Sequence, residues 1–368
     1  MGSAGPSGYH DEARASGPGL VVGRSGASFG KVHYCPSDYW PLNTALFATD
    51  FMGNDPRYAY YALKTLDLTT FNSGSAQASL NRNFIASIPI EIPPKAEQLR
   101  ISSILAALDD KIDSNRRLAG LFEEAAAEIF RARFVDFAGV DEFEDSEIGD
   151  VPRGWGVGTL GDLATVSKQS VKPVESPDSL FEHFGILEFD AGRRPEIVPG
   201  AQLLSGKTLV PDRDCLLLSK LNPATRRVWW PRPTGRHAAI TSPEFVVLVP
   251  RNGIPITYLY AVVGRDERFY GELLSHVSGT TGSRQRVKPD AALGCRTMVP
   301  ATSELEEWDL VARPLYDRAA AATSESATLA SVRDALLPKL ISGEIRVPDI
   351  EDPAEVIEPA ADGLGVVA

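Results

Sequence analysis

Cysteine is scarce in this sequence: its 368 residues contain only Cys35, Cys215 and Cys295, which are far apart and form no C-x-x-C pair. An odd, scattered set argues against a disulfide framework or a zinc site and fits a reducing compartment such as the cytoplasm. We expect the three to be small buried hydrophobic residues. No apolar run approaches the roughly 18 residues that a membrane span requires, so no membrane partner is expected.

Motifs for catalysis are also missing. The five histidines follow no metal-ligand spacing, G-x-S-x-G is absent, and "LNPATRR" lacks the second proline of an adenine methyltransferase motif. The stretch "LVVGRSGASFGKVHY" has the Gly30-Lys31 of a phosphate-binding loop, but Ser25 replaces the first glycine and Val32 replaces the hydroxyl residue. We therefore expect a non-catalytic chain that binds neither metal nor cofactor.

The charge is unevenly distributed. The net charge is −12, and acidic residues dominate residues 136–150 and 344–362. The segment from Arg193 to Arg236, in contrast, contains nine basic residues and three acidic residues. Such a local excess predicts a phosphate-binding face, with a solvated basic surface as the alternative.

Two long amphipathic segments are predicted to be helices. In the first, after Pro93-Pro94, apolar residues recur in steps of four and three, typical of a coiled-coil seam with one polar member. In the second, apolar residues recur every seven positions. We expect the helices to pair antiparallel, with a helical-bundle core as the alternative. The predicted pairing residues are Ile101, Leu105, Leu108, Ile112, Asn115, Phe122 and Ile129 in the first, and Trp308, Leu315, Leu329 and Leu336 in the second.

An internal repeat sets the organisation. Leu20–Val32 aligns with Leu216–Val228 at an offset of 196, and "NSGSAQASLNRNFIASIPIEIPP" aligns with "VSGTTGSRQRVKPDAALGCRTMVPA" at 205 to 207. The two polar segments within this second match each end in an arginine, Arg82 and Arg286. The predicted fold is α+β: a tandem duplication of a mixed strand-and-loop globular domain followed by a long helix. The expected segments are a first domain (1–95), a helix (96–135), an acidic linker (136–152), a second domain (153–301), a helix (302–342) and an acidic tail (343–368).

Several motifs together resemble the specificity subunit of type I restriction-modification enzymes. They are "GPGLVVGRSG", "WPLNTALF", "NSGSAQASLNRNFIASIPIEIPP", "LDDKI" with "FVDF", and "LLPKLISGEI", and they span nearly the whole chain. The resemblance implies two target-recognition domains, each reading half of a split site in double-stranded DNA. It also implies that the helices dock modification (methyltransferase) subunits, that restriction (translocase and nuclease) subunits join the complex, and that S-adenosylmethionine, ATP and Mg²⁺ are bound by those partners.

Motif position and charge together nominate the DNA-contacting residues. Arginine can bind phosphate or guanine, and small polar side chains read base edges. The Gly-Ser segments before Arg82 and Arg286 fit close approach to a duplex, with simple surface turns as the alternative. The predicted contacts are Arg24, Ser25, Lys31, Gln77, Asn81 and Arg82 in the first domain, and Lys220, Asn222, Arg226, Arg227, Arg232, Thr280, Ser283, Arg284 and Arg286 in the second.

The two domains differ before the repeated strand. About sixty residues precede "CLLLSKLN" in the second domain, but only about twenty precede "LVVGRSG" in the first. We therefore expect the first domain to be shortened at its N-terminus. Two rival hypotheses are a truncated or inactive protein that reads one half-site, and a coiled-coil scaffold that binds protein partners.

Overall fold

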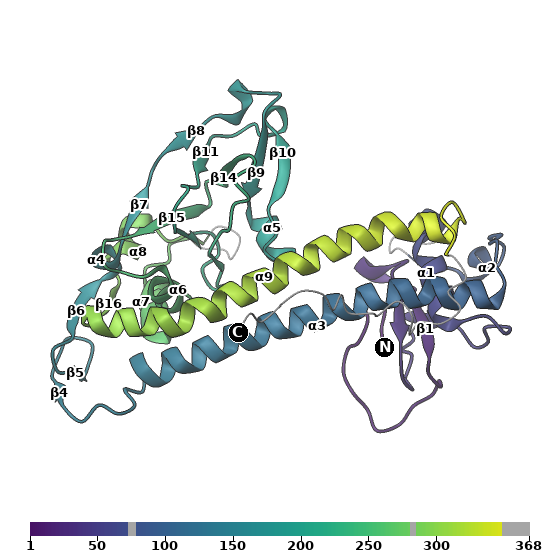
Figure 1. Cartoon of the computed structure of the whole chain (residues 1–368), viewed down its shortest axis with the longest axis horizontal. Coiled ribbons are helices and arrows are strands. Elements are labelled where there is room, and N and C mark those ends of the chain that lie inside the picture. Colours follow the sequence, from purple (N-terminus) through teal and green to yellow (C-terminus); the bar gives the residue numbers. More distant parts are fainter. Residues whose placement is uncertain (73–78, 280–284, 348–368) are drawn as a thin grey trace, which may run out of the picture. The chain divides into compact units, whose positions relative to one another are not determined.

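A computed structural model describes residues 1–72, 79–279 and 285–347 (Figure 1). The chain divides into two compact units: unit 1 contains residues 1–114 and the described residues from 325 onward, and unit 2 contains residues 115–324. Helix α3, Lys95–Phe134, begins in unit 1 and ends in unit 2, while α9, Thr302–Ile341, begins in unit 2 and ends in unit 1. Both 40-residue helices lie within one residue of the limits expected from the sequence. The predicted α+β fold with two long helices is confirmed.

The other helices and strands are short. Those of unit 1 are β1 Gly19–Gly23, β2 Val32–Cys35, β3 Ala45–Phe47, α1 Pro56–Lys64 and α2 Arg82–Ile85. Those of unit 2 are β4 Phe143–Glu144, β5 Val151–Pro152, β6 Gly156–Thr159, α4 Leu160–Leu163, β7 Ala164–Ser167, β8 Ser170–Val171, β9 Leu180–Phe184, α5 Ile186–Asp190, β10 Glu196–Pro199, β11 Lys207–Leu209, β12 Leu216–Ser219, β13 Val228–Trp229, β14 Ala238–Thr241, β15 Phe245–Pro250, α6 Ile256–Arg265, α7 Glu267–Ser275, α8 Pro289–Gly294 and β16 Arg296–Val299.

The central sheets of the two units share a three-stranded core. In unit 1 the strand order is β2-β1-β3, and in unit 2 it is β13-β12-β15-β7, with β7 as an additional strand. β1 pairs antiparallel with β2 and β3, just as β12 pairs antiparallel with β13 and β15. The repeat inferred from the sequence is therefore a repeat of structure.

Backbone hydrogen bonds confirm the offset of 196. The Gly23 N–H donates to the Lys31 carbonyl at 2.8 Å, and the Ser219 N–H donates to the Arg227 carbonyl at 3.0 Å. The turn after the first strand matches as well, because Gly26 (φ +80°) and Asn222 (φ +46°) occupy the same left-handed backbone conformation. Glycine and asparagine are the residues that adopt this conformation most readily.

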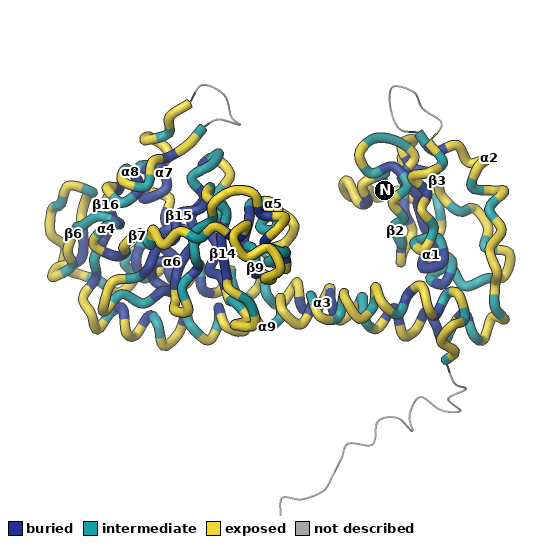
Figure 2. The backbone as a smooth tube through the Cα atoms, turned by 90° about the horizontal axis from the view of Figure 1, so that it is seen from above, coloured by how far each residue is buried: buried dark blue, intermediate teal, exposed yellow. Residues whose placement is uncertain are grey.

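The central strands are buried on both faces, and alternation assigns their side chains to two cores. In β12, Leu216 and Leu218 pack into the core formed with α6, while Leu217 packs into the opposite core with Phe184. Figure 2 shows β15 and α6 as largely buried. Full burial of one such aliphatic side chain contributes about 1.5–3 kcal/mol.

Unit 2 contains a second sheet, with the order β10-β9-β14-β11-β8, that has no counterpart among the described residues of unit 1. Its strands come mainly from the chain that precedes β12, the region in which the two sequence repeats differ in length. The acidic stretch between α3 and the second domain also folds, because β4 and β5 pair antiparallel. The structural repeat thus covers the central sheet and the part of each copy that comes after it.

In unit 1, α3 and α9 pack antiparallel. Ile101 and Leu105 share a buried cluster with Leu337 and Leu340. Arg333 donates to Asp109 at 2.6 Å farther along the same pair of helices. The helix pairing predicted from the sequence is thus present in this unit.

In unit 2, the helices pack through aromatic side chains. The ring of Trp308 lies 5.7 Å from that of Phe130 and 5.6 Å from that of Phe134, and all three side chains are fully buried. Arg133 donates to Glu304 on the facing helix at 2.6 Å. These contacts join the helix pair to the large core that contains α6.

The predicted seam is wrong at its C-terminal end. Ile129 is 37% exposed, and Phe130 and Phe134 occupy the buried positions instead. An α-helix drifts about 20° per heptad from a 3.5-residue repeat, so four heptads carry the seam roughly 80° around the helix. On α9 the buried residues are Tyr316 and Leu337, each one position after a predicted residue. The predicted residues, Leu315 and Leu336, are half-buried. The other predicted positions are buried, except for the half-buried Leu108, Phe122 and Leu329.

Trp308→Ala is expected to lower the free energy of unfolding by about 3–5 kcal/mol, because it leaves a cavity between two phenylalanine rings. Leu310→Ala on the same helix, where the side chain is 77% exposed, should change it by less than about 0.5 kcal/mol. Urea denaturation of the full chain, followed by circular dichroism, measures both. Equal effects would contradict the assignment of Trp308 to the core.

Gly26→Val is expected to cost about 1–3 kcal/mol, because valine resists the left-handed conformation. No other residue lies within 4 Å of a Cβ built at this position, so the cost comes from the backbone alone. Gly26→Asn should cost clearly less, since asparagine occupies the matching position of unit 2. Thermal unfolding of the two variants distinguishes them, and equal destabilisation would refute the equivalence of the two turns.

Candidate nucleic-acid interface

In each unit, a later part of the chain returns to the end of the central strand and closes a small hydrogen-bonded junction. Junction 1 is formed by Arg24, Ser25, Thr44, Asn72, Ser79 and Leu80, and junction 2 by Lys220, Leu221, Glu244, Ser278, Arg286 and Val287. In the sequence, the polar segments predicted to approach DNA lie between Asn72 and Ser79 of junction 1 and between Ser278 and Arg286 of junction 2. The junctions are therefore the candidate interface.

The backbone closes both junctions in the same way. The N–H of Arg24 donates to the Thr44 carbonyl at 2.8 Å, and the Leu80 N–H donates to the Arg24 carbonyl at 2.8 Å. In unit 2 the matching bonds are Lys220 to Glu244 at 2.9 Å and Val287 to Lys220 at 3.0 Å. Arg24 and Lys220 are thus equivalent residues, each held by its own N–H and carbonyl.

The same bonds set the offset of the later part of the repeat at 207, the upper end of the range predicted from the sequence. Ser25 bridges to Ser79 in unit 1, and Leu221 bridges to Arg286 in unit 2, so Ser79 is the counterpart of Arg286. The arginines that end the two polar segments, Arg82 and Arg286, are therefore not equivalent, contrary to what the sequence had suggested. Arg82 instead begins α2, as Pro289 begins α8.

The cations at the end of the central strands are available to a ligand. The side chains of Arg24 and Lys220 have no hydrogen-bond or ion-pair partner among the described residues, and the same holds for Lys31 and Arg82. Arg24, Lys31 and Arg82 are exposed, and Lys220 is half-buried. A basic side chain that has no ion-pair partner, and that occurs at the same place in both copies, can neutralise a DNA phosphate.

Three other predicted contacts are engaged within unit 2. Arg226 donates both terminal nitrogens to Glu267 at 2.9 Å and lies over the Tyr270 ring at 3.8 Å. Arg227 donates to Asp190 at 2.7 and 2.8 Å, and its side chain is only 12% exposed.

Arg232 pairs with Asp317 at 2.7 Å and stacks on Trp230 at 3.7 Å. The ion pairs of Arg226, Arg227 and Arg232 join neighbouring elements of unit 2. The arrangement therefore favours a structural role for these residues over a role as free phosphate ligands.

Arg286 is paired but accessible. Its Nε and Nη2 donate to the Glu244 carboxylate at 3.2 and 2.9 Å, and the arginine side chain is 47% exposed. The hydrogen bond to Glu244 raises the pKa of Arg286 above its ordinary value. Glu244 was not predicted from the sequence, although the shared pattern of a polar residue before an apolar strand (Thr44 before β3, Glu244 before β15) could have found it.

The remaining predicted contacts are small polar residues. Asn81 accepts a hydrogen bond from the Asn83 N–H at 3.0 Å and caps α2, and the Asn222 side chain donates to the Thr225 hydroxyl at 3.3 Å. Ser25 lies in junction 1 itself. Gln77, Thr280, Ser283 and Arg284 lie outside the described residues, so these predictions stay open.

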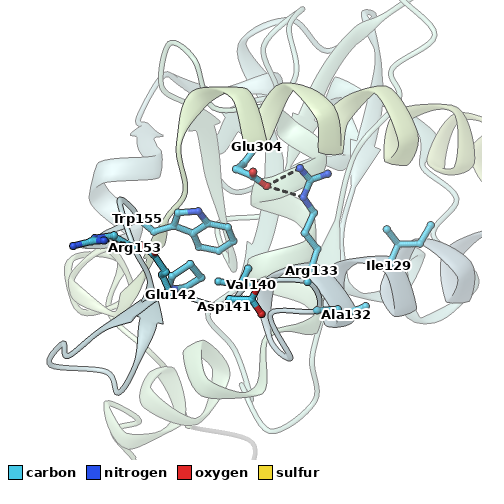
Figure 3. Close-up of a pocket in the computed structure, with 12 residues that line it drawn as sticks. Ile129, Ala132, Arg133, Val140, Asp141, Glu142, Arg153, Trp155 and Glu304 are labelled. Carbon is cyan, nitrogen blue, oxygen red and sulfur yellow. Dashed lines mark hydrogen bonds and ion pairs between the residues drawn. The ribbon is translucent and has the colours of Figure 1, made fainter.

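Unit 2 also contains an open hollow of about 830 Å³ beside the end of α3 (Figure 3). Its cations are already paired, Arg133 with Glu304 at 2.6 Å and Arg153 with Glu142 at 2.6 Å. Asp141 adds a further negative charge to the lining. Such a surface repels phosphate, so the hollow is a poorer candidate for nucleic acid than the junctions.

Metal-ligand clusters and membrane-spanning helices are both absent from the described ranges. Across residues 1–72, 79–279 and 285–347, no three His, Cys, Asp or Glu side chains gather as metal ligands would. No helix in those ranges combines the length and apolar character needed to cross a membrane. The three cysteines are buried and free, as expected from their number and spacing.

Comparison with known proteins shows what this chain is similar to. Residues 3–120 match the type I restriction modification DNA specificity domain. The chain is 23% identical over 318 residues to the type I restriction enzyme MjaIX specificity subunit of Methanocaldococcus jannaschii, covering 80% of this chain and 70% of that protein. It is 26% identical over 114 residues to the EcoprrI specificity subunit of Escherichia coli, covering 31% of this chain and 28% of that protein.

The fold has a solved counterpart. The type I restriction-modification S subunit from M. genitalium aligns with a TM-score of 0.59 and 15% identity, covering 94% of this chain and 86% of that one. This similarity establishes the fold. The matching domain is described by its DNA specificity, and both relatives are specificity subunits of type I restriction enzymes.

Arg227→Ala is expected to destabilise unit 2 at neutral pH. Hydrogen bonds from Arg227 hold the pKa of Asp190 below its ordinary 3.8. A lowered carboxyl pKa contributes stability above the unfolded-state pKa, and this contribution is lost as the pH falls through the folded-state value. The stability difference between wild type and variant should therefore be constant above roughly pH 5 and shrink below pH 4.

Urea denaturation at pH 7 and pH 3 measures this difference, with Asp190→Asn as the control that removes the titrating group. A variant as stable as wild type at pH 7 would argue against the structural role of the pair.

Proposed function

We propose that this chain, which is similar to the DNA specificity subunits of type I restriction-modification enzymes, is such a subunit and that its two junctions each read one half of an interrupted DNA site. The observation that carries the proposal is the duplicated junction, in which Arg24 and Lys220 occupy equivalent positions on identically bonded backbone. Two copies of one DNA-reading frame, with different side chains around them, suit a site whose two halves differ in sequence.

The residues of each junction suit two different roles, phosphate binding and base reading, which supports this function. Lysine and arginine side chains without an ion-pair partner can fix the position of the protein on the phosphates without regard to sequence. Neighbouring polar side chains can read the edges of the nucleobases. In junction 2, Lys220 fits the first role and Arg286 the second. In junction 1, Arg24 fits the first role, with Ser25 and Ser79 beside it.

The chemistry after recognition is assigned to other chains. In this proposal the specificity subunit is non-catalytic and directs methylation by modification subunits and cleavage by restriction subunits. S-adenosylmethionine, ATP and Mg²⁺ would be bound by those partners. The complex would act in the cytoplasm, where it meets the DNA.

Lys220→Ala and Arg24→Ala are each expected to weaken duplex binding by the assembled complex and to reduce the slope of log K against log salt by about one, the loss of one phosphate contact. Titration of a fluorescent duplex at several salt concentrations measures the slope. Lys172→Ala is the matched control, because this exposed lysine of unit 2 is paired with Glu175 and is not one of the residues that form junction 2. A slope unchanged in both junction variants would contradict the proposal.

A further inference from the structure

We propose that Arg286 reads a guanine through the free end of its guanidinium group and that Glu244 is the positioning residue that orients this end, an inference that rests on the function proposed above. It goes further than charge or motif position, because it names one base, one edge of one side chain and a carboxylate that does not touch DNA.

The geometry of the ion pair leaves a second donor fork free. A guanidinium group has five N–H donors in one plane. Glu244 accepts from Nε at 3.2 Å and from Nη2 at 2.9 Å, so it occupies the side of the group. Both N–H groups of Nη1 and one of Nη2 have no partner among the described residues.

The free fork matches guanine in chemistry and shape. One N–H from Nη1 and one from Nη2 point in parallel, which suits two neighbouring acceptors. In the major groove, O6 and N7 of guanine form such a pair, and a bidentate arginine is the commonest specific contact to it. A carboxylate on the other side holds the plane of the guanidinium and lowers the entropy lost on binding.

Backbone hydrogen bonds hold both Arg286 and Glu244 in place. The N–H and the carbonyl of Arg286 each bond to Ser278 at 2.9 Å. The carbonyl of Glu244 accepts from the Lys220 N–H at 2.9 Å. Glu244 is 27% exposed and Arg286 is 47% exposed, so the supporting side chain is the more covered of the two.

The two other predicted contacts that form bidentate ion pairs, Arg226 and Arg227, do not combine a free end with accessibility. The end of the Arg226 guanidinium is already occupied, because Nη1 and Nη2 both donate to Glu267. Arg227 is held side-on by Asp190, as Arg286 is by Glu244, but it is only 12% exposed. Arg286 therefore combines a free end with an accessible position.

The pair is confined to one of the two junctions. Ser79 stands in junction 1 where Arg286 stands in junction 2, and Thr44 stands where Glu244 stands. Neither side chain can form this ion pair. The inferred guanine contact therefore belongs to one half of the site.

Selection of bound duplexes from a randomised pool tests the inference, using the full chain assembled with its modification subunits. Wild type should select an interrupted motif with an invariant G·C pair in one half. Arg286→Ala should reduce discrimination at that one pair by about 5- to 150-fold and leave the other positions unchanged.

Glu244→Ala separates orientation from charge. It keeps the cation and removes its support, so discrimination at the same pair should fall while binding to non-specific duplex is retained or strengthened. Arg153→Ala is the matched control, since it removes an exposed arginine of unit 2 that is paired with Glu142 outside junction 2, and it should leave every base preference intact.

Two outcomes overturn the inference alone: a motif from Arg286→Ala identical to that of wild type, or a uniform loss of affinity across all duplexes, which would make Arg286 a phosphate contact. A wild-type complex that selects no motif would overturn the proposed function and the inference with it. The wild-type arm therefore distinguishes the two failures.

Discussion

A pair of backbone hydrogen bonds at the end of the central strand supports everything else in each junction. One residue, Arg24 in unit 1 and Lys220 in unit 2, donates its N–H to one strand and accepts at its carbonyl from the returning chain. Backbone bonds place few demands on side-chain identity. The two junctions can therefore keep one frame while their side chains differ, as Ser79 and Arg286 do. A protein that must read two unrelated half-sites needs this separation of frame from side chain.

The charge of the chain fits the same account once partners are considered. Arg226, Arg227 and Arg232 make unit 2 look basic in sequence, but each is paired with a carboxylate that joins elements of the fold. Among the predicted contacts that the structure describes, Arg24, Lys31, Arg82 and Lys220 have no such partner. For these contacts, the ion pairs that each cation makes are a better guide to the interface than the local excess of basic residues.

The sequence predicted the α+β class, the long helices and the first part of the repeat. Leu20–Val32 and Leu216–Val228 each run from the central strand through a turn to the start of the next strand over the same number of residues. The prediction failed where lengths change. The second copy is longer than the first between the Gly-Ser motif and the returning chain, so the arginines that end the two polar segments, Arg82 and Arg286, do not occupy equivalent positions. The burial of Ile129 was wrongly predicted because the 3.5-residue repeat was extended along the whole helix, whereas Phe130 and Phe134 are the residues that enter the core of unit 2. Glu244 was missed because its partner is distant in sequence.

Long-read methylation mapping of cells that carry this chain with its modification subunits tests the central claim most directly. Two junctions that each read half a site predict a methylated motif in two defined parts separated by unspecified bases. A motif with one defined part would contradict the claim that both junctions read DNA, and the absence of new methylation would contradict the proposed function itself.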